Sequence, residues 1–561
     1  MSSVEGWSRR KHGRVVWAGE HLWPSVAVGL FAVITPVAIW WILQHPFGTN
    51  WDEANYINQA IRDRSALYQG PWELLKAILR RDASRPPAYR ILVLPVTALL
   101  GASPMVLRLF SWGTFGGTLW LMYLTGERLR DSATGGFVVC FLLGCPILIG
   151  PNMRFYVDYS LYLSIAGTLY CLFCQWDHPK SRSWIGLGLC LGLGAMAKPT
   201  IAFIVGPMLV LVMLLRLLKW IAAPSLATLF KSYGLAGLIM APWWVLNGKA
   251  ALTKAVSSGG NIRDALGHQG ELGTLLKWCH VFVQSITGPM LGVLAGAIAI
   301  SYCLNTFLRY RAQLSRSQSL ALIVCLTGVL PLAWIAAFGV NHNPRLIAPL
   351  LLPLGLALGL MASAQGWLTY KPIAAVALVL MVAQVSVMVT PHGSGDRYQE
   401  GDTFAQSHNW GNSTSVMRLE EQWDWTPLYQ LAQQRQLENP KIGYLGSAKT
   451  LNPPQLLLPW VMAGKTANVA QLWNFKAGPV DWDALLKRAS TKDIVVTFSP
   501  EDAAPSDLAA VIENQHNIEF SERISQTDDF MPLTSIPMGK FSPTDVHIFI
   551  HKIRETKAQY S

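Results

Sequence analysis

The chain has 561 residues, of which 51% are hydrophobic and only 14% are charged, and its mean hydropathy is +0.30. Soluble domains carry about 25% charged residues, so this composition excludes an ordinary soluble globular protein. The net charge of +12 fits positively charged cytoplasmic loops and sites for an anionic lipid or phosphate, and we expect no nucleic-acid partner.

The first predicted element is a membrane span over His21–Leu43. Arg9, Arg10, Lys11 and Arg14 precede it, and the positive-inside rule places them and the N-terminus in the cytoplasm. Later apolar runs approach the roughly 20 residues that cross a bilayer as a helix. The clearest of these runs are Ile201–Leu218, Val281–Ala299, Ala321–Val340 and Pro372–Thr390. We therefore expect a polytopic α-helical membrane protein.

The charges of the loops decide which runs cross the bilayer. Residues 88–102 form a short apolar run, and if they crossed, every later basic loop would lie on the wrong side. We expect this run to lie on, or dip into, the outer interface. The module at 1–390 then has about eleven spans, and the chain is expected in a bacterial inner (plasma) membrane with residues 391–561 outside the cytoplasm.

The external loop at 45–88 is long and rich in charge of both signs. Its apolar residues recur at helical spacing over Asp52–Asp63 and Pro71–Arg81. Amphipathic helices of this kind lie in the plane of the membrane surface, so this loop is predicted to work at the outer interface.

The polar tail alternates short β-rich runs with helical patterns, which is typical of a small α/β domain. The predicted strands are Lys441–Leu445, Asp493–Phe498 and Val546–His551, and the predicted helices are Pro427–Gln436, Trp482–Ala489 and Asp507–Asn514. The tail has no G-x-G-x-x-G, so nucleotide binding has no support there.

Two adjacent carboxylates, Asp52 and Glu53, follow the first span. A carboxylate at a membrane edge is energetically costly unless it is solvated, paired with a cation or required for function. Adjacent side chains point in different directions, so one can face a cavity while the other caps the helix that begins here. Alternatively, both are helix N-terminal charges that the macrodipole favours.

A series of short motifs continues from this acidic pair along the chain. In chain order they are Asp52-Glu53, Arg85-Pro86-Pro87-Ala88-Tyr89, Val106-Leu107-Arg108, Arg154 with Asp158, Ala197-Lys198-Pro199, Pro242-Trp243-Trp244 and Pro344-Arg345. In their order and spacing they resemble the motifs of the GT-C glycosyltransferases, especially the branch of protein O-mannosyltransferases and lipid A aminoarabinose transferases. The resemblance covers roughly residues 20–365 and departs from the family where Arg85 stands for the usual His or Lys before two prolines.

The resemblance implies transfer of a hexosyl or pentosyl group, with inversion, from a polyprenyl-phosphate donor to a glycan, lipid or protein acceptor at the outer face. It implies that Asp52 is the general base, with Glu53 as the less favoured alternate, and that Asp158 is a second acidic residue of the cavity. A carboxylate suits the removal of a proton from a hydroxyl acceptor.

A departing lipid phosphate develops negative charge, which nearby cations must stabilise. The candidates for substrate and phosphate binding are Arg85, Tyr89, Arg154, Lys198 and Arg345. Arg85 and Arg154 could instead be snorkelling residues, and Lys198 could be a plain loop lysine.

Arg154 and Asp158 are spaced for an i,i+4 ion pair if their segment is helical. A divalent cation between Asp52 and Asp158 is possible through oxygen ligands, but two carboxylates do not establish it, and no other cofactor is expected. His268 and His342 lack the spacing of a zinc site.

Two other classes of function compete with the glycosyltransferase. A multi-span transporter or flippase for lipids or glycans should carry ionisable residues near the midplane of broken helices, whereas here the charges gather in external loops. A non-catalytic subunit that presents its tail to partners would tolerate substitution of Asp52.

Overall fold

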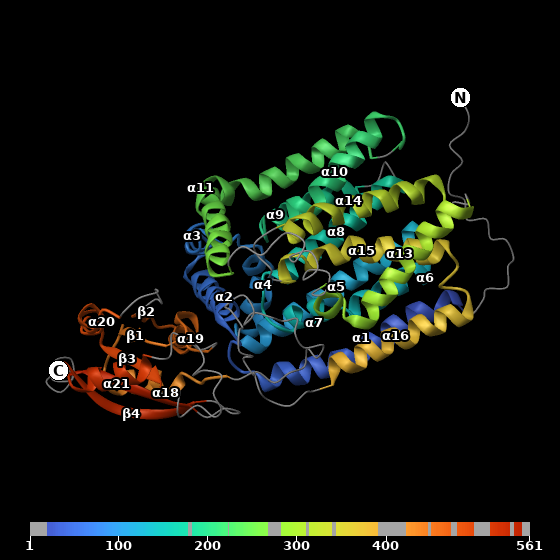
Figure 1. The fold of residues 1–561 in the computed structure, drawn as a ribbon. Coiled ribbons are helices and arrows are strands. Elements are labelled where there is room, and N and C mark those ends of the chain that lie inside the picture. The colour runs from blue at the N-terminus through green and yellow to red at the C-terminus, as the bar shows by residue number, and fades with distance from the viewer. Residues whose placement is uncertain are drawn as a thin grey trace.

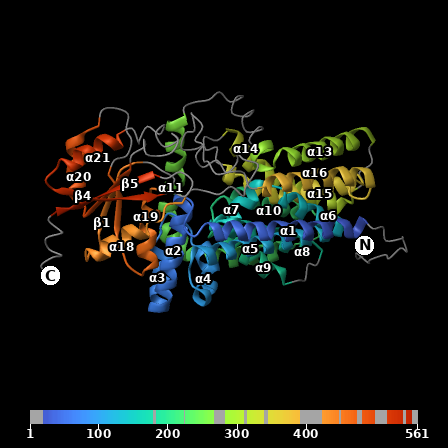
Figure 2. The same cartoon turned by 90° about the horizontal axis from the view of Figure 1, so that it is seen from below.

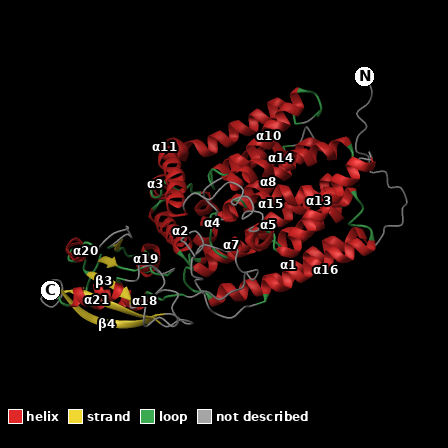
Figure 3. Ribbon diagram, viewed as in Figure 1, coloured by secondary structure: helices red, strands yellow, loops and turns green. Residues whose placement is uncertain are grey.

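The computed structural model describes a mostly helical chain followed by a small mixed α/β domain (Figures 1 and 3). The described residues are 19–177, 182–222, 224–266, 282–309, 314–338, 344–390, 422–446, 450–472, 480–498, 516–538 and 544–552. The sheet domain lies at one end of the helix bundle beside α2 and α3, and α1 begins at the opposite end (Figure 1).

The bundle is built from apolar helices that pack around one continuous hydrophobic core. They are α1 (Gly19–Gln44), α5 (Pro104–Leu129), α6 (Ser132–Leu143), α7 (Pro146–Met153), α8 (Asp158–Asp177), α9 (Ser183–Ala195), α10 (Ile201–Leu217), α11 (Leu226–Leu266), α13 (Pro289–Arg309), α14 (Arg316–Phe338), α15 (Leu351–Ala364) and α16 (Lys371–Val389). A short π-helix, η1 (Phe282–Ile286), precedes α13, and two 3₁₀ turns, η2 (Pro344–Leu346) and η3 (Ala348–Leu350), precede α15.

Length and composition identify only some of the helices as long and apolar enough to cross a membrane. In the described chain, 4 helices qualify outright, and α6 with α7, bent by 69°, could form another span. Five shorter apolar helices lie among the rest. The apolar bundle agrees with the predicted polytopic class, while the number of about eleven spans stays a prediction.

Helix α4 (Ala88–Leu100) covers the run that we expected not to cross. Its 13 residues extend about 20 Å, which is short of a hydrocarbon core of about 30 Å. In Figure 2, α2, α3 and α4 run across the direction of α1 and α5. A helix of this length and direction suits the interfacial position that the loop charges favour.

The two predicted helices of the external loop are present as α2 (Trp51–Gln69) and α3 (Pro71–Arg80). Gly70 joins them at φ 127°, a conformation that side chains with a Cβ rarely adopt. Helix α2 packs against both α3 and α4. Whether this loop lies outside the cytoplasm stays a prediction.

The tail contains a five-stranded sheet in the order β2-β1-β3-β5-β4. Its strands are β1 (Lys441–Tyr444), β2 (Asn468–Gln471), β3 (Ile494–Phe498), β4 (Phe530–Met538) and β5 (Thr544–His551). Strand β1 pairs in parallel with β2 and β3, whereas β5 is antiparallel to β3 and β4. The result is a mixed sheet with β1, β3 and β5 in its middle.

Helices cover both faces of this sheet. Successive side chains of a strand point to opposite faces, and in β3 the side chains on both faces are apolar and buried. Ile494, Val496 and Phe498 of β3 pack with α18 (Thr426–Gln434) and α19 (Pro453–Met462). Val495 packs on the other face with α20 (Trp482–Ala489) and α21 (Asn517–Ser525).

The sequence pattern predicts the buried middle of this domain better than its margins. Strands β1, β3 and β5 and helices α18 and α20 lie where they are predicted. The predicted helix Asp507–Asn514 lies outside the described residues. Sequence reasoning missed β2, β4, α19 and α21; β2 is an edge strand of only 4 residues, and β4 contains two prolines, which argue against a strand.

The membrane orientation can be tested by cysteine labelling. In a background without the eight native cysteines, Thr491→Cys in the sheet domain should react with a membrane-impermeant maleimide in intact cells. Thr369→Cys, at the opposite end of the bundle between α15 and α16 (Figure 1), should react only after lysis. The reverse pattern would place the sheet domain in the cytoplasm.

Candidate functional site

The acidic pair lies in the first turn of α2, immediately after a short segment that follows α1. Asn50 is the N-cap of α2, and its side chain accepts a hydrogen bond from the Glu53 amide, so the capping role considered for the acidic residues belongs to Asn50. Successive residues of a helix are rotated by about 100°. The Asp52 side chain is 32% exposed, whereas that of Glu53 is 0% exposed.

Glu53 is fully engaged inside the protein. Both of its oxygens face the Arg108 guanidinium, at 2.7 Å from Nε and 2.8 Å from Nη2. The Phe155 amide and the Thr49 amide and hydroxyl also donate to it. Burial alone would raise the pKa of Glu53, but the charge of Arg108 and these hydrogen bonds lower it to about 2. This carboxylate is therefore ionised at neutral pH and has little access to an acceptor.

Asp52 belongs to a separate cluster of charges. Arg345, from η2, lies between two carboxylates: its Nη1 is 3.3 Å from Asp52 Oδ2 and its Nη2 is 2.8 Å from Asp158 Oδ2. Asp158 begins α8 and is fully buried, and its other oxygen is 2.6 Å from Lys198 Nζ. Asp158 thus holds two cations side by side.

Arg85 completes the cluster from the loop between α3 and α4. Its Nη2 is 3.8 Å from Asp52 Oδ1, and its Nη1 is 3.5 Å from Asp82 Oδ2. The guanidinium also lies over the Tyr56 ring, 5.7 Å from the centroid. Three cations, Arg85, Lys198 and Arg345, therefore meet three carboxylates, Asp52, Asp82 and Asp158.

Aromatic rings form one wall of the cluster. The Arg345 guanidinium lies 4.0 Å from the centroid of Tyr156, and the Tyr56 ring packs between those of Tyr156 and Tyr89. Burial raises the pKa of Tyr56, and the Asp52 carboxylate raises it further, so this phenol stays protonated. Tyr89, predicted as a substrate-binding residue, is fully buried behind Tyr56.

Arg154 is directed toward α1 and not toward Asp158. Its Nη1 donates to the Gly150 carbonyl at 3.0 Å, and its guanidinium lies 4.4 Å from the Trp41 ring centroid. Asp158 takes Arg345 and Lys198 as its partners. The segment containing Arg154 is extended at that residue, which removes the helical i,i+4 spacing.

A bridging metal would compete with a cation of the protein. Arg345 occupies the position between Asp52 and Asp158, and in the described part of the chain no three His, Cys, Asp or Glu side chains gather in one place. The possible divalent cation stays an untested expectation.

Sequence reasoning left three neighbours of the site without a role: Arg108, Tyr56 and Tyr156. The role of Arg108 could have been predicted, because an arginine inside the apolar run 106–126 needs an acidic partner when it is buried. The roles of Tyr56 and Tyr156 could not, because aromatic residues are common at membrane interfaces.

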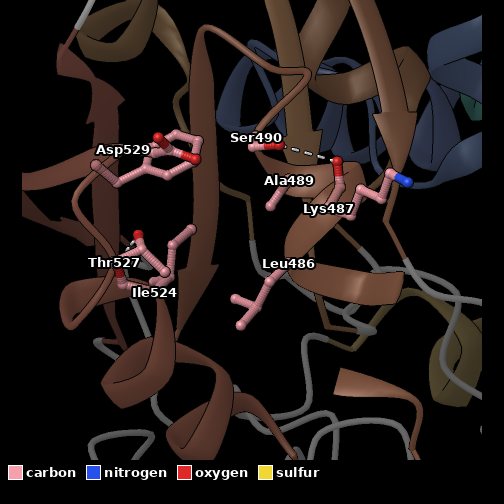
Figure 4. A pocket seen from close by; sticks show the side chains of 8 residues that line it. Leu486, Lys487, Ala489, Ser490, Ile524, Thr527 and Asp529 are labelled. Atoms are coloured by element: carbon pink, nitrogen blue, oxygen red, sulfur yellow. Dashed lines mark hydrogen bonds between the residues drawn. The ribbon is translucent and has the colours of Figure 1, made fainter. Parts of the chain in front are cut away.

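A small hollow also occurs in the sheet domain, between α20, α21 and β4 (Figure 4). It measures about 170 Å³ and is lined mainly by Leu486, Lys487, Ile524, Asp529 and Phe530. It lies on the face of the sheet opposite α19, and α19 is the helix that contacts α2. This hollow is therefore separate from the charged cluster.

Comparisons with known proteins place this geometry in a wider context. Residues 84–245 match the family model described as dolichyl-phosphate-mannose-protein mannosyltransferase. The structure is similar to that of ArnT from Cupriavidus metallidurans bound to undecaprenyl phosphate, with a TM-score of 0.52 and 13% identity over 93% of this chain and 97% of that one. It is also similar to the oligosaccharyltransferase of Archaeoglobus fulgidus tethered with an acceptor peptide, with a TM-score of 0.52 and 10% identity over 92% of this chain and 74% of that one. No curated protein matches the chain.

These similar proteins are GT-C glycosyltransferases, so the resemblance found in the sequence motifs is confirmed. At 10% to 13% identity the structural likeness establishes the fold. The predicted class, apolar helices followed by a small α/β domain, is likewise confirmed.

The Glu53–Arg108 pair yields a stability prediction. Glu53→Gln leaves the Arg108 charge buried without its carboxylate, a loss that typically costs about 3–5 kcal/mol, so the thermal midpoint in detergent should fall well below that of Asp52→Asn. Because the pKa of Glu53 is lowered from 4.5 to about 2, its contribution is complete above about pH 4.5 and is lost as the pH falls toward 2. Equal midpoints for the two variants would contradict a structural role for Glu53.

Proposed function

We propose that this chain, which has the GT-C fold, is a glycosyltransferase that moves a sugar from a polyprenyl-phosphate carrier to a glycan, lipid or protein acceptor at the outer membrane surface. The observation that carries the proposal is a cluster in which a partly exposed carboxylate, Asp52, pairs with Arg345 and Arg85, while the buried carboxylate of Asp158 holds Arg345 and Lys198. Such a cluster suits a phosphate together with a group that accepts a proton.

Asp52 is the proposed general base because it is the accessible carboxylate of the three candidates. Its side chain is 32% exposed, while those of Glu53 and Asp158 are 0% exposed. The oxygens of Glu53 are held by Arg108, and those of Asp158 by Arg345 and Lys198. An acceptor hydroxyl can therefore reach Asp52 without breaking a buried ion pair.

Arg345, Arg85 and Lys198 are proposed to bind the phosphate of the donor. A guanidinium matches two phosphate oxygens with its planar fork, and an ammonium acts as a point charge. Asp158 serves as their positioning residue, since a buried carboxylate 2.6 Å from Lys198 and 2.8 Å from Arg345 holds both cations at one place. Arg154, which lies against Trp41, is proposed to support the packing of α1 and not to contact the phosphate.

In the proposed reaction the acceptor oxygen attacks the anomeric carbon while Asp52 takes the hydroxyl proton. The bond between the anomeric carbon and the phosphate oxygen breaks, and its electron pair leaves on the lipid phosphate. Cations fixed beside that oxygen stabilise the developing charge. A single displacement of this kind inverts the anomeric configuration.

Asp52→Asn tests the base. The amide keeps the size of the side chain but cannot accept the proton, so transfer should fall by about 10²–10⁴-fold while the thermal midpoint stays at the wild-type value. The assay is transfer of labelled sugar from a polyprenyl-phosphate pool in membranes. As a matched control, Glu73→Gln removes an exposed carboxylate of α3 that pairs with Lys76 and should leave transfer unchanged.

Wild-type transfer by Asp52→Asn at equal expression would remove this residue from the chemistry. Transfer that stays unchanged when the whole chain is deleted would instead favour the lipid or glycan transporter that the multi-span architecture also allows.

Arg345→Ala tests the phosphate site. Losing one preorganised cation should lower kcat/KM for the lipid donor by about 10²–10³-fold, and Arg345→Lys should recover only part of this because a single ammonium cannot reach both carboxylates and the phosphate. As a control, Arg80→Ala removes an exposed arginine at the end of α3, outside the cluster. If Arg345→Ala were no worse than Arg80→Ala, donor binding by this cluster would be disproved.

A further inference from the structure

The segment His45–Asn50, which leads into Asp52, is held from the membrane side by Arg108. This arginine donates to the His45 carbonyl and, at 2.6 Å, to the Phe47 carbonyl, while its remaining donors bind Glu53. A segment without regular structure carries peptide groups that need partners when they are buried. Arg108 supplies two of those partners from α5 of the bundle.

The sheet domain supplies further partners for the same segment. Gln422 forms a reciprocal pair of hydrogen bonds with the backbone of Phe47, at 2.9 Å to the carbonyl and 3.4 Å from the amide. Gln455, in α19, donates from Nε2 to the Gly48 carbonyl at 2.7 Å and to the Asn50 carbonyl at 3.4 Å. Gln455 is itself only 2% exposed, so these bonds are shielded from water.

Close packing supports the same contact. A Cβ at Gly48 would lie 3.0 Å from Ala54 Cβ and 3.2 Å from Gln455 Nε2, so the absence of a side chain there lets α19 approach the start of α2. Asn58 of α2 also donates to the Pro454 carbonyl at 2.8 Å. Leu458 of α19 is 2% exposed and packs in the same cluster as Tyr56 and Tyr156, the two rings beside the charged site.

We infer that Gln455 and Gln422 are positioning residues, through which the sheet domain holds the His45–Asn50 segment and so sets the position of Asp52. The inference rests on the proposed function in one respect: Asp52 must be the reacting carboxylate. The domain is then a structural half of the catalytic site, and not a separate module attached to a complete enzyme.

The physical reason is that the carbonyl of Asn50 also accepts the first hydrogen bond of α2, from the Ala54 amide. Gln455 therefore donates a hydrogen bond to the same carbonyl at which the helix begins, and this carbonyl lies two residues before Asp52. A displacement of about 1 Å in a catalytic group can cost about 10²-fold in rate. Donor binding depends on Arg345, Arg85 and Lys198, none of which belongs to this segment, and should be much less affected.

Gln455→Glu in the full chain tests the inference. The carboxylate keeps the size of the side chain but cannot donate to the two carbonyls. We expect kcat to fall by about 10–10²-fold, with KM for the lipid donor within about twofold of wild type. Gln434→Glu makes the same chemical change on the exposed side of α18 and should leave both constants unchanged. Gln422→Ala, which removes the bonds to Phe47 from a different segment, should repeat the loss of kcat.

A double variant separates positioning from general destabilisation. Because Gln455 acts through Asp52, Asp52→Asn combined with Gln455→Glu should be no slower than Asp52→Asn alone, whereas independent effects would multiply. Multiplying effects, or wild-type kcat in both Gln455→Glu and Gln422→Ala, would overturn the inference. If Gln455→Glu does not fold, the Gln422→Ala variant and its combination with Asp52→Asn decide the matter by the same criteria. Failure of the proposed function is a different result, namely full activity of Asp52→Asn.

Discussion

The buried ion pair of Glu53 and Arg108 is the interaction on which the site depends. Both side chains are 0% exposed, and an ion pair without water is tolerated only when its remaining donors and acceptors are satisfied. Here they are satisfied by the backbone of the segment before α2 and by the Phe155 amide. The pair therefore joins the end of α1, the start of α2, helix α5 and the turn before α8, which are the elements around the site.

This constraint assigns different tasks to two adjacent carboxylates. Because Glu53 must point into the bundle toward Arg108, the helical rotation turns Asp52 toward Arg345 and Arg85. One carboxylate is then buried inside an ion pair, and its neighbour is partly exposed and is the one proposed to accept the proton. Asp158 shows the same principle at the start of α8: it is fully buried, and one oxygen faces Lys198 while the other faces Arg345, so it holds these two cations together.

The sheet domain extends this network beyond the membrane part. Its glutamines bind backbone groups of the segment that Arg108 holds from the opposite side, and its Leu458 reaches the aromatic wall of the cluster. The domain follows α16 in the chain, yet its contact with the segment before α2 bridges more than 400 positions of sequence, as the Gln455–Gly48 separation of 407 shows. A site with walls from both parts can exclude water only when the two parts are docked, which suits a reaction in which water would compete with the acceptor.

Local patterns in the sequence were sufficient to predict the apolar helices, α2 and α3, and strands β1, β3 and β5, because periodicity and run length are properties of neighbouring residues. The motifs that carry the family resemblance also singled out Asp52, Asp158, Arg85, Lys198 and Arg345, which the structure brings into one cluster. What they could not decide was which charges meet. Asp52 and Arg345 are 293 positions apart, and Arg154 turns to Trp41 although Asp158 is four residues away. Burial of Glu53 in place of Asp52, and the use of Gln455 from the distant domain, follow from packing that brings α2, α5, α8 and α19 together. Those choices depend on which side chains exclude water from one another, and only the tertiary structure determines that.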